Sequence, residues 1–583
     1  MPGFFCEIRS GKLNKQFSSV VDSLNLLVES TEGNGFYVER RTVRKFLNDK
    51  VLCNDERYLI LTEGVILNSK SLIKKYGKEN LRDTVIEMYE KNGEAFFNEF
   101  RGSFSGVLYD KKLNKWLIYT NHVGDKWVFY SVLEDGIVVG SELPWVVSYL
   151  KKNGIRYSFD EFGAYCLLTY GYMLEDYTLI KEVKRLLPGH YIKIENGKVT
   201  VNQYFKLDNT PDETQSEEEI IENVDRLFRR AIELEFEKDR EYGYKHIATL
   251  SAGLDSRMVV WVAHEMGYTE QLNVTFSQTN YLDETVAKKI ASDLKHEWLF
   301  KSLDNGIYLK SATEMIDING GLVLYSGSAH TNSCVKLINF SNFGLYHTAQ
   351  LGDVILGTYY DAESPNAPYV PGTGAYSKEL VAENEQNYLK MKYENLEIFK
   401  FYNRGFNGIL SGNLPVQRWT EVTSPFLDVD FLTYSITIPL KYRYDHRIYK
   451  KWILKKYPKA AEYVWEKIQG RITERVYSMM GYKFTLRGLY RRAISKLLYG
   501  SSSNSKWHMN PFEYWYRTND DLKNYFEERF NNVISIVPNC VKVFPDHNFR
   551  DLIGKLFYNY GVVEKTQALT ILEAWRYYFE DLV

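Results

Sequence analysis

The sequence predicts an α/β protein with a layered, β-rich first part and a second part built on a parallel sheet. Up to about residue 205, short apolar runs alternate with turns of Gly, Asn and Asp, as expected of short strands with a few helices. From residue 246, strands alternate with helices, which indicates a parallel sheet covered on both faces. A chain of 583 residues also exceeds what one core usually supports, so we expect two domains.

The strands of the first part follow one another at short intervals. They are predicted at Gly3–Ile8, Tyr58–Leu61, Gly106–Tyr109, Trp116–Thr120, Trp127–Tyr130, Ile137–Gly140 and Tyr191–Ile194. Asp208–Ser216 is polar, contains proline and has no periodic pattern, so it is a plausible junction. Ser216 and Glu219 then form a capping-box pattern that opens a helix. We therefore predict domains at residues 1–207 and 217–583.

The stretch from Lys245 to Glu265 has the pattern of an anion-binding strand, loop and helix. A short apolar strand, His246–Leu250, leads into the loop SAGLDS and then into an amphipathic helix. The first N–H groups of that helix and its positive dipole end would point into the loop. Ser251 and Ser256 add hydroxyl groups, Gly253 lets the backbone approach closely, and Asp255 offers hard oxygen for Mg²⁺. The alternative is an ordinary strand-to-helix turn.

This loop resembles the SGGxDS pyrophosphate loop of ATP pyrophosphatases, with Ala252 in place of the first glycine. Further along, HTAQLGDVILGTY (His347–Tyr359) is similar to the LSGEGADELFGGY segment of asparagine synthetases, which implies that Asp353 is a second metal ligand. SPFLD (Ser424–Asp428) resembles another landmark of that family, and Lys467 in YPKAAEYVWEKIQG matches its late catalytic lysine. Asp353 as a simple turn residue and Lys467 as a surface lysine are the alternatives.

The resemblance implies a binding site for ATP and Mg²⁺. Asp255 and Asp353 would hold the metal, Ser251, Gly253 and Ser256 the pyrophosphate, and Lys467 would stabilise charge in the transition state. Backbone and apolar groups near Leu250, Phe276 and Ser277 are expected at the adenine. The family's glutamates in the Asp353 loop are replaced by Gln350 and Val354, which leaves the substrate open.

The first part resembles the glutaminase domain of asparagine synthetases, an N-terminal-nucleophile sandwich of α/β/β/α layers. The similarity lies in EGVILN (Glu63–Asn68), FRGSFSGVLYD (Phe100–Asp110), TNHVGDKWVFY (Thr120–Tyr130), GSELPWVVSYL (Gly140–Leu150) and the segment Tyr170–Ile194. The family's nucleophilic cysteine, however, is Pro2 here, and its oxyanion-hole asparagine is Glu63. Cys6 lies inside a predicted strand, where a buried thiol is expected. We therefore expect no glutaminase activity.

The resemblance, which covers nearly the whole chain, implies an ATP-dependent synthetase that adenylates a carboxylate, releases pyrophosphate and joins the acyl group to an amine. The nitrogen donor stays open, because family members without the cysteine, such as β-lactam synthetases and lasso peptide cyclases, close an amine of the substrate onto the adenylate. Free ammonia or an amino sugar is equally allowed. An ammonia-dependent asparagine synthetase and a silent nucleotide-binding scaffold are the other hypotheses.

Composition limits the partners of the chain. A formal charge of −2 and no nucleic-acid motif give no drive toward nucleic acid. The five scattered cysteines indicate neither a zinc site nor a disulfide frame and suit a reducing cytoplasm. With no apolar run long enough to span a bilayer, we expect a cytoplasmic protein. The resemblance implies small-molecule or peptide carboxylate and amine substrates. Tyr359–Ser377 and Gly500–Lys506 are expected to be mobile, and the final helix to dock by one apolar face.

Overall fold

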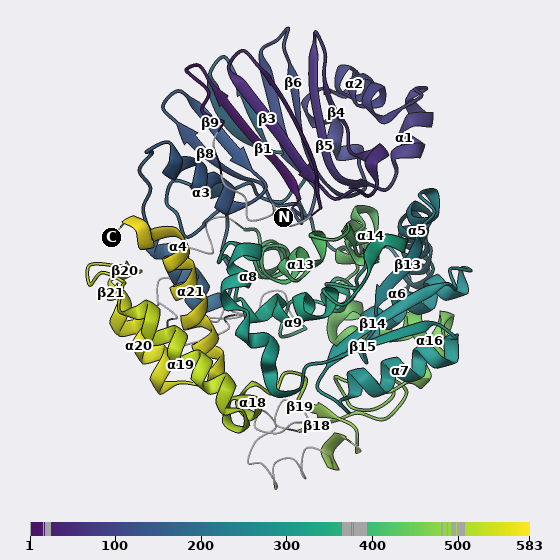
Figure 1. Ribbon diagram of the computed structural model, residues 1–583. Helices are drawn as coiled ribbons and strands as arrows, with labels where there is room; N and C mark the ends of the chain where they lie inside the picture. The colour runs from purple at the N-terminus through teal and green to yellow at the C-terminus, as the bar shows by residue number, and fades with distance from the viewer. Residues whose placement is uncertain are drawn as a thin grey trace.

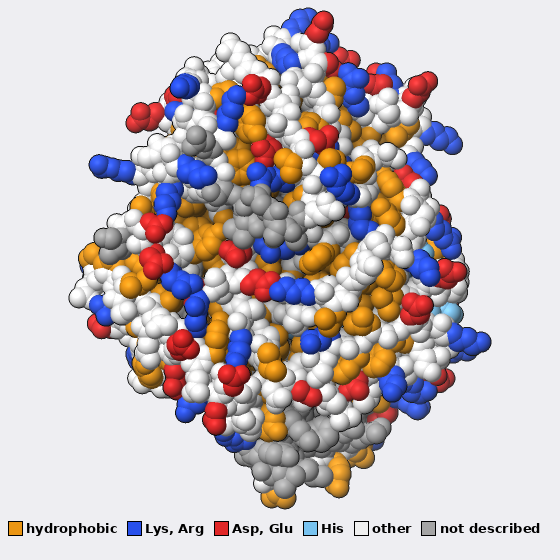
Figure 2. Space-filling view, viewed as in Figure 1, with side chains coloured by type: hydrophobic (Ala, Val, Ile, Leu, Met, Phe, Trp, Pro, Cys, Tyr) orange, Lys and Arg blue, Asp and Glu red, His pale blue; other side chains and the backbone are white. Residues whose placement is uncertain are grey.

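The computed structural model describes residues 2–15, 17, 25–363, 375, 377, 380, 393–479, 482–486, 488–490, 497 and 508–582. Most of the loop expected at Tyr359–Ser377 and all of Gly500–Lys506 lie outside these residues. A two-sheet sandwich forms one end of the molecule, and the parallel sheet and the C-terminal helices form the other (Figure 1). Basic and acidic side chains are interspersed on the face seen in Figure 2. No described helix is both long and apolar enough to cross a membrane.

Two six-stranded antiparallel sheets form the sandwich, which confirms the layered β-rich prediction. The first sheet has the order β10 (Lys184–Arg185), β8 (Phe129–Leu133), β9 (Gly136–Gly140), β1 (Gly3–Arg9), β3 (Phe36–Thr42) and β2 (Leu27–Gly33). The second has the order β12 (Lys198–Gln203), β11 (His190–Glu195), β7 (Lys115–Thr120), β6 (Gly102–Asp110), β5 (Tyr58–Ile66) and β4 (Leu52–Asn54).

Alternation along the strands sends neighbouring side chains to different layers. Phe4 and Cys6 of β1 pack in the core between the sheets, whereas Phe5 faces the outer layer. In β5, Leu59 packs in the core between the sheets and Ile60 faces the outer layer. The outer layers are α1 (Ser69–Tyr76) and α2 (Leu81–Asn92) on the second sheet, and α3 (Leu143–Lys152) and α4 (Glu161–Tyr170) on the first. The α/β/β/α layering is therefore present.

The predicted capping box opens α5 (Glu217–Glu241). Ser216 Oγ accepts a hydrogen bond from Glu219 N, and the Glu219 carboxylate accepts one from Ser216 N. Acidic residues fill the first turn, where they complement the helix dipole. The helix leads into the parallel sheet; the domain division at residues 208–216 stays a prediction.

The parallel sheet has the order β15 (Glu297–Ser302), β14 (Gln271–Ser277), β13 (Lys245–Thr249), β16 (Phe343–His347) and β17 (Val422–Thr423). Its two faces are covered by helices, as predicted, because successive strand residues point in opposite directions. Ala248 packs with α5, α6 (Leu254–Glu265) and α16 (Arg447–Lys456), and Ile247 with α9 (Ser326–Val335) and α13 (Leu414–Gln417). α7 (Leu282–Leu294) covers β14 and β15. The chain adds β14 and β15 on one side of β13 and then β16 and β17 on the other, so the strand order switches at β13, and a ligand crevice is expected at its carboxyl end.

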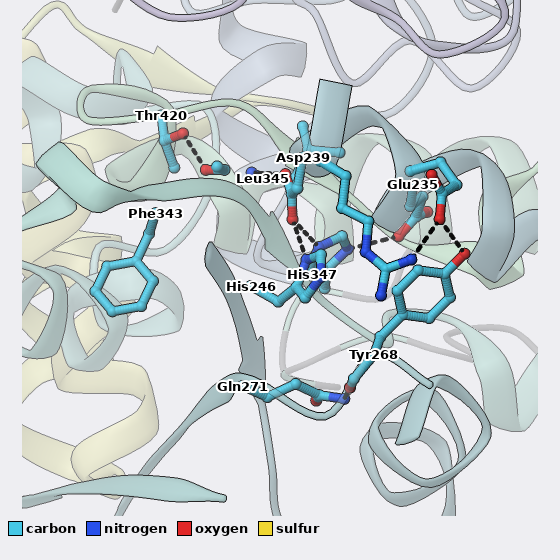
Figure 3. Close-up of polar contacts among 12 residues, drawn as sticks. Glu235, Asp239, His246, Tyr268, Gln271, Phe343, Leu345, His347 and Thr420 are labelled. Atoms are coloured by element: carbon cyan, nitrogen blue, oxygen red, sulfur yellow. Dashed lines mark hydrogen bonds and ion pairs between the residues drawn. The ribbon is translucent and has the colours of Figure 1, made fainter. Parts of the chain in front are cut away.

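A buried polar cluster joins α5 to this sheet (Figure 3). Asp239 Oδ2 lies 2.8 Å from both His246 Nδ1 and His347 Nε2, and Glu235 Oε2 lies 3.0 Å from His347 Nδ1. The two histidines and Asp239 are residue types that also bind metals, with ligand atoms within 4.8 Å of one another. Direct hydrogen bonds already satisfy these atoms, so the cluster is explained as a bridge between helix and sheet.

The C-terminal helices pack together beside the parallel-sheet part (Figure 1). They are α18 (Phe512–Thr518), α19 (Asp520–Ile534), α20 (Phe549–Asn559) and α21 (Val562–Phe579). α21 differs from the single-face docking helix that its sequence predicts, because every residue from Lys565 to Trp575 is buried. Its buried Glu573 is paired with Arg529 and Arg576, which removes the cost of an isolated charge.

Candidate active site

The loop after β13 folds back on itself through its own hydroxyl groups. Ser251 N donates to Ser256 Oγ at 2.9 Å, the two serine Oγ atoms lie 2.9 Å apart, and Gly253 N donates to Ser251 Oγ at 3.1 Å. Gly253 is the N-cap of α6 and brings no side chain to its first turn. The first N–H groups of α6 are thus left available at the loop, which is the arrangement that binds anions at helix N-termini.

Two residues that the sequence analysis missed hold this loop in place. Buried Asp283 of α7 accepts a hydrogen bond from Ala252 N at 2.9 Å. The fully buried Arg257 of α6 donates to the carbonyls of Ala252, Ala460, Tyr463 and Val464 at 2.7 to 3.2 Å. Arg257 therefore ties the loop to the segment that carries Lys467.

The two predicted metal ligands, Asp255 and Asp353, lie side by side. Asp353 N donates to Asp255 Oδ2 at 3.0 Å, and Tyr449 OH donates to Asp255 Oδ1 at 2.8 Å. Burial and the nearby charge of Asp353 raise the pKa of Asp255 to about 8. The pKa of Asp353 is also raised by desolvation from the surrounding protein. Its side chain nevertheless remains exposed to solvent. Two carboxylates that repel each other form a hard-oxygen site that fits Mg²⁺.

Two cations face this pair. Lys467 is exposed, and its positive charge partly offsets the rise in the pKa of both aspartates. Its Nζ lies 5.8 Å from the centre of the Trp465 ring. Arg404, which the sequence analysis did not single out, also lowers the pKa of Asp353. Within the described residues, no hydrogen bond or ion pair occupies the Arg404 guanidinium. Both side chains are free to meet the negative charge of a substrate.

A cavity of about 710 Å³ opens at the carboxyl edge of the parallel sheet. Of the predicted nucleotide-binding residues, Leu250, Ser251, Gly253, Asp255, Ser256 and Phe276 line it. The side chain of Ser277 does not: it is buried and donates to the carbonyl of Gln278 at 3.0 Å, so only its backbone remains a candidate. Asp353 and Lys467 are placed by their interactions with Asp255 rather than in the cavity lining.

The cavity has two sides. The β14 lobe is formed by Leu250, Val274, Phe276, Leu303 and His330, and the β16 lobe by Thr348, Ala349, Gln350, Arg404 and Gly408. The β14 lobe combines apolar and aromatic side chains with the polar residues Thr275 and Thr331, whereas the β16 lobe carries a cation, Arg404. The loop at Ser251–Ser256 lies between them, because β13 is paired with β14 on one side and β16 on the other.

The sandwich half contributes to the wall of the cavity. Tyr170, the last residue of α4, lines it together with Gly171 and Tyr172, which follow the helix. The next residues anchor the π-helix η6 (Phe401–Gly408), which carries Arg404. Asn403 Oδ1 accepts a hydrogen bond from Glu175 N at 2.7 Å, and Asn407 Nδ2 donates to the carbonyls of Met173 and Glu175. These contacts fix Arg404 beside Asp353; no local motif in the sequence signals them.

The residues around the start of β1 have no nucleophile in the family's position. Pro2 is buried and has no thiol, and Cys6 is fully buried in the core between the sheets, as expected. Burial raises the pKa of the Cys6 thiol well above its usual range. The Glu63 side chain is also buried and accepts a hydrogen bond from Thr42 Oγ1 at 2.7 Å.

An ion-pair network fills the space beside Glu63 and Gly64. Lys50 Nζ lies 2.7 Å from Glu421 Oε1 and 3.9 Å from Glu63 Oε1. Lys126 Nζ lies 2.6 Å from Glu421 Oε2, and a Cβ at Gly64 would lie 3.0 Å from Lys126 Cε. Glu421 comes just before β17, so the network joins the sandwich to the parallel-sheet part. Lysine side chains and carboxylates therefore fill the position at which the resemblance implies an oxyanion hole.

Comparison with known proteins finds similarity to a glutamine amidotransferase domain, an amidase and asparagine synthetases. Residues 48–205 match the glutamine amidotransferase domain family. The amidase chyE of Penicillium rubens is 26% identical over 32% of this chain and 26% of its own length. A putative glutamine-hydrolysing asparagine synthetase of Methanocaldococcus jannaschii is 24% identical over 44% of this chain and 52% of its own. The Gallus gallus asparagine synthetase is 22% identical over 67% of each chain. This chain thus spans from about a quarter to two thirds of these relatives.

Proposed function

We propose that this chain, a member of the asparagine synthetase family with a glutaminase-like domain, activates a carboxylate with ATP and joins the acyl group to an amine without hydrolysing glutamine. In the first step a carboxylate oxygen of the substrate attacks the α-phosphorus of ATP, the bond to the bridging oxygen of the β-phosphate breaks, and pyrophosphate leaves. In the second step the amine nitrogen attacks the acyl carbon, AMP leaves, and the amine loses a proton.

The pairing of Asp255 with Asp353 is the observation that supports this proposal most. Two strand ends bring these carboxylates together beside a serine-lined helix N-terminus, and burial raises the pKa of Asp255. Two adjacent carboxylates repel each other, and a bound cation relieves that repulsion. Bound Mg²⁺ would neutralise the carboxylates and the phosphate oxygens. Ser251, Ser256 and the first N–H groups of α6 would hold the pyrophosphate.

The chain's own cations would stabilise the two transition states. The positive charge of Lys467 interacts with both aspartates, and Arg404 lines the cavity on the β16 side. Negative charge builds up first on the five-coordinate phosphorus and then on the tetrahedral carbon, and fixed positive charges stabilise both. Arg257 and Asp283 would act as positioning residues, because both hold the loop through hydrogen bonds to the backbone of Ala252. Catalysis would consist of positioning and electrostatic stabilisation.

The amine would come from a substrate and not from glutamine. Pro2 has no thiol, the Cys6 thiol is buried and protonated, and Glu63 places a carboxylate where an oxyanion would need a hydrogen-bond donor. In the β16 lobe, Gln350 donates its amide N–H to Ile409 O and leaves a buried Oε1 with no partner among the described residues.

A screen for carboxylate-dependent release of pyrophosphate from MgATP tests this function, with Asp255→Ala as the blank. Release with one acid, enhanced by an amine and unaffected by glutamine, is expected. Release with aspartate and ammonium alone would instead identify an ammonia-dependent asparagine synthetase. Stoichiometric glutamate from glutamine would contradict the proposed loss of glutaminase chemistry. Isothermal titration that detects no MgATP binding would leave only a silent scaffold.

A further inference from the structure

A fully buried tyrosine of α16 reaches the carboxylate pair from outside the cavity. The hydroxyl of Tyr449 donates to Asp255 Oδ1 at 2.8 Å, and Asp255 is the partner that the described part of the chain gives this hydroxyl. A buried phenol needs a hydrogen-bond partner in any protein. Because the acceptor here is a proposed metal ligand, this bond can affect metal binding as well as packing.

The carboxylate of Asp255 is held at both of its oxygens. Asp353 N donates to Oδ2 at 3.0 Å, so a rotation of the carboxylate about its Cβ–Cγ bond would break this hydrogen bond and the one from Tyr449 together. A carboxylate oxygen has about two lone-pair sites, so each oxygen keeps one for a cation. The two hydrogen bonds therefore fix the direction from which Asp255 offers oxygen to a metal.

Packing keeps the Tyr449 ring in place. The ring stacks on Trp452, with centres 5.8 Å apart and an interplanar angle of 26°, and it meets the edge of Phe426 at 6.3 Å. Trp452 is itself fixed by a hydrogen bond from its Nε1 to Asp225 of α5 at 2.9 Å. Since close-packed side chains have few alternative positions, the hydroxyl of Tyr449 cannot follow a carboxylate that moves.

We propose that Tyr449 is a positioning residue for the metal: it holds Asp255 in the orientation in which Asp255 and Asp353 together take the Mg²⁺ of MgATP. Tyr449 is not part of the cavity wall, so it acts through Asp255. Groups that orient a metal ligand by a hydrogen bond typically contribute about 10- to 100-fold to metal affinity. This inference rests on the proposed function, since it needs MgATP at the aspartate pair.

A second tyrosine beside the same tryptophan provides a matched control. Tyr457 follows α16, is buried, donates to Asp225 Oδ1 at 2.6 Å and meets the edge of Trp452 at 5.5 Å. Asp225 does not line the cavity. Tyr457→Phe thus removes the same kind of hydrogen bond without touching the aspartate pair. If Tyr449 were only structural, the two exchanges would affect ligand binding alike.

Isothermal titration with MgATP, and with ATP in EDTA, separates the two roles. We expect Tyr449→Phe to bind MgATP at least about tenfold more weakly than the wild type does, and to bind ATP in EDTA within about twofold of it. Tyr457→Phe should match the wild type in both titrations. Wild-type affinity of Tyr449→Phe for MgATP would overturn the proposal, as would an equal loss with and without the metal. A wild-type protein that binds MgATP no better than ATP in EDTA would overturn the proposed metal site itself.

Urea unfolding of the same three proteins completes the test. Each variant loses one buried hydrogen bond, so we expect both to unfold at lower urea concentrations than the wild type, and only Tyr449→Phe to lose affinity for MgATP. A loss of MgATP affinity that both variants share would assign the effect to packing around Trp452 and overturn the proposal. If Tyr449→Phe does not fold, Tyr449→Met, which also lacks the hydroxyl and fills irregular gaps, takes its place in both titrations.

Discussion

At the scale of single residues, the cysteines provide a direct test of the lost nucleophile. Cys6 is fully buried and its thiol pKa is raised, whereas Cys540 is exposed. Because the thiolate is the reactive form, we expect iodoacetamide to label Cys540 in the native protein and Cys6 only after unfolding. Peptide mass spectrometry measures both sites in one sample. Labelling of native Cys6 as fast as Cys540 would contradict the proposed absence of glutaminase chemistry.

Arg404 provides a second residue-scale prediction. Arg404→Gln removes a guanidinium that faces Asp353 and the cavity, so we expect pyrophosphate release to fall tenfold or more, since removal of one transition-state charge partner typically costs about 10²-fold or more. Arg404→Lys should retain part of the activity. Arg226→Gln, at an exposed position of α5, is the matched control and should be unchanged. An Arg404→Gln protein with normal release would remove Arg404 from the mechanism.

At the scale of elements, the four-residue helix α10 (Gly352–Ile355) has to approach Asp255 closely. A Cβ at Gly352 would lie 2.7 Å from Asp255 Cγ and 2.8 Å from a ring carbon of Phe426. We therefore expect Gly352→Ala to push Asp255 out of place and to weaken MgATP binding at least tenfold by titration. Gly554→Ala in α20 is the control, because a Cβ there meets no atom within 4 Å. If Gly352→Ala bound MgATP as tightly as the wild type, the close approach of α10 to Asp255 would not be needed for the metal site.

The same elements show what the sequence could predict. Local patterns located β13, α6, β14 and α7, because strand and helix periodicity and the capping of α5 are properties of short segments. They also placed Asp255 and Asp353 at strand ends. Tyr449 was missed because its contact with Asp255 spans 194 positions, and nothing near Tyr449 marks it. Arg404 and Tyr172 were missed for the same reason. The π-helix that carries Arg404 is anchored on the sandwich half by long-range tertiary contacts, which no local sequence pattern indicates.

At the scale of the whole molecule, one buried carboxylate joins the two halves. Glu421 holds Lys50 and Lys126 at 2.7 and 2.6 Å, and both lysines lie in the sandwich. Glu421→Gln would remove the nearest counter-charge of two buried ammonium groups and leave only the more distant Glu63, so we expect a loss of about 3 to 5 kcal/mol in the free energy of unfolding. Glu213→Gln, which breaks the exposed pair with Lys441, should cost less than about 1 kcal/mol. Equal costs in urea titration would contradict a stabilising role for the network.

The cluster of Glu235, Asp239, His246 and His347 predicts how stability depends on pH (Figure 3). Burial alone would lower the pKa of His347, but Asp239 and Glu235 outweigh it and raise that pKa to about 9. An imidazolium held between two carboxylates stabilises the fold fully below its unfolded pKa of about 6.5, and this contribution disappears as the pH rises through 9. Burial also raises the pKa of Glu235, which acts in the same direction.

We therefore expect the free energy of unfolding to fall between pH 6.5 and pH 9, by on the order of 3 kcal/mol from His347 alone, since one pKa unit corresponds to about 1.4 kcal/mol. His347→Gln, which cannot carry the charge, should be less stable at pH 6.5 and should lose much less stability on going to pH 9. Urea titrations of both proteins at the two pH values measure the difference. Parallel pH profiles would show that the bridge between α5 and the parallel sheet works without the charged imidazole.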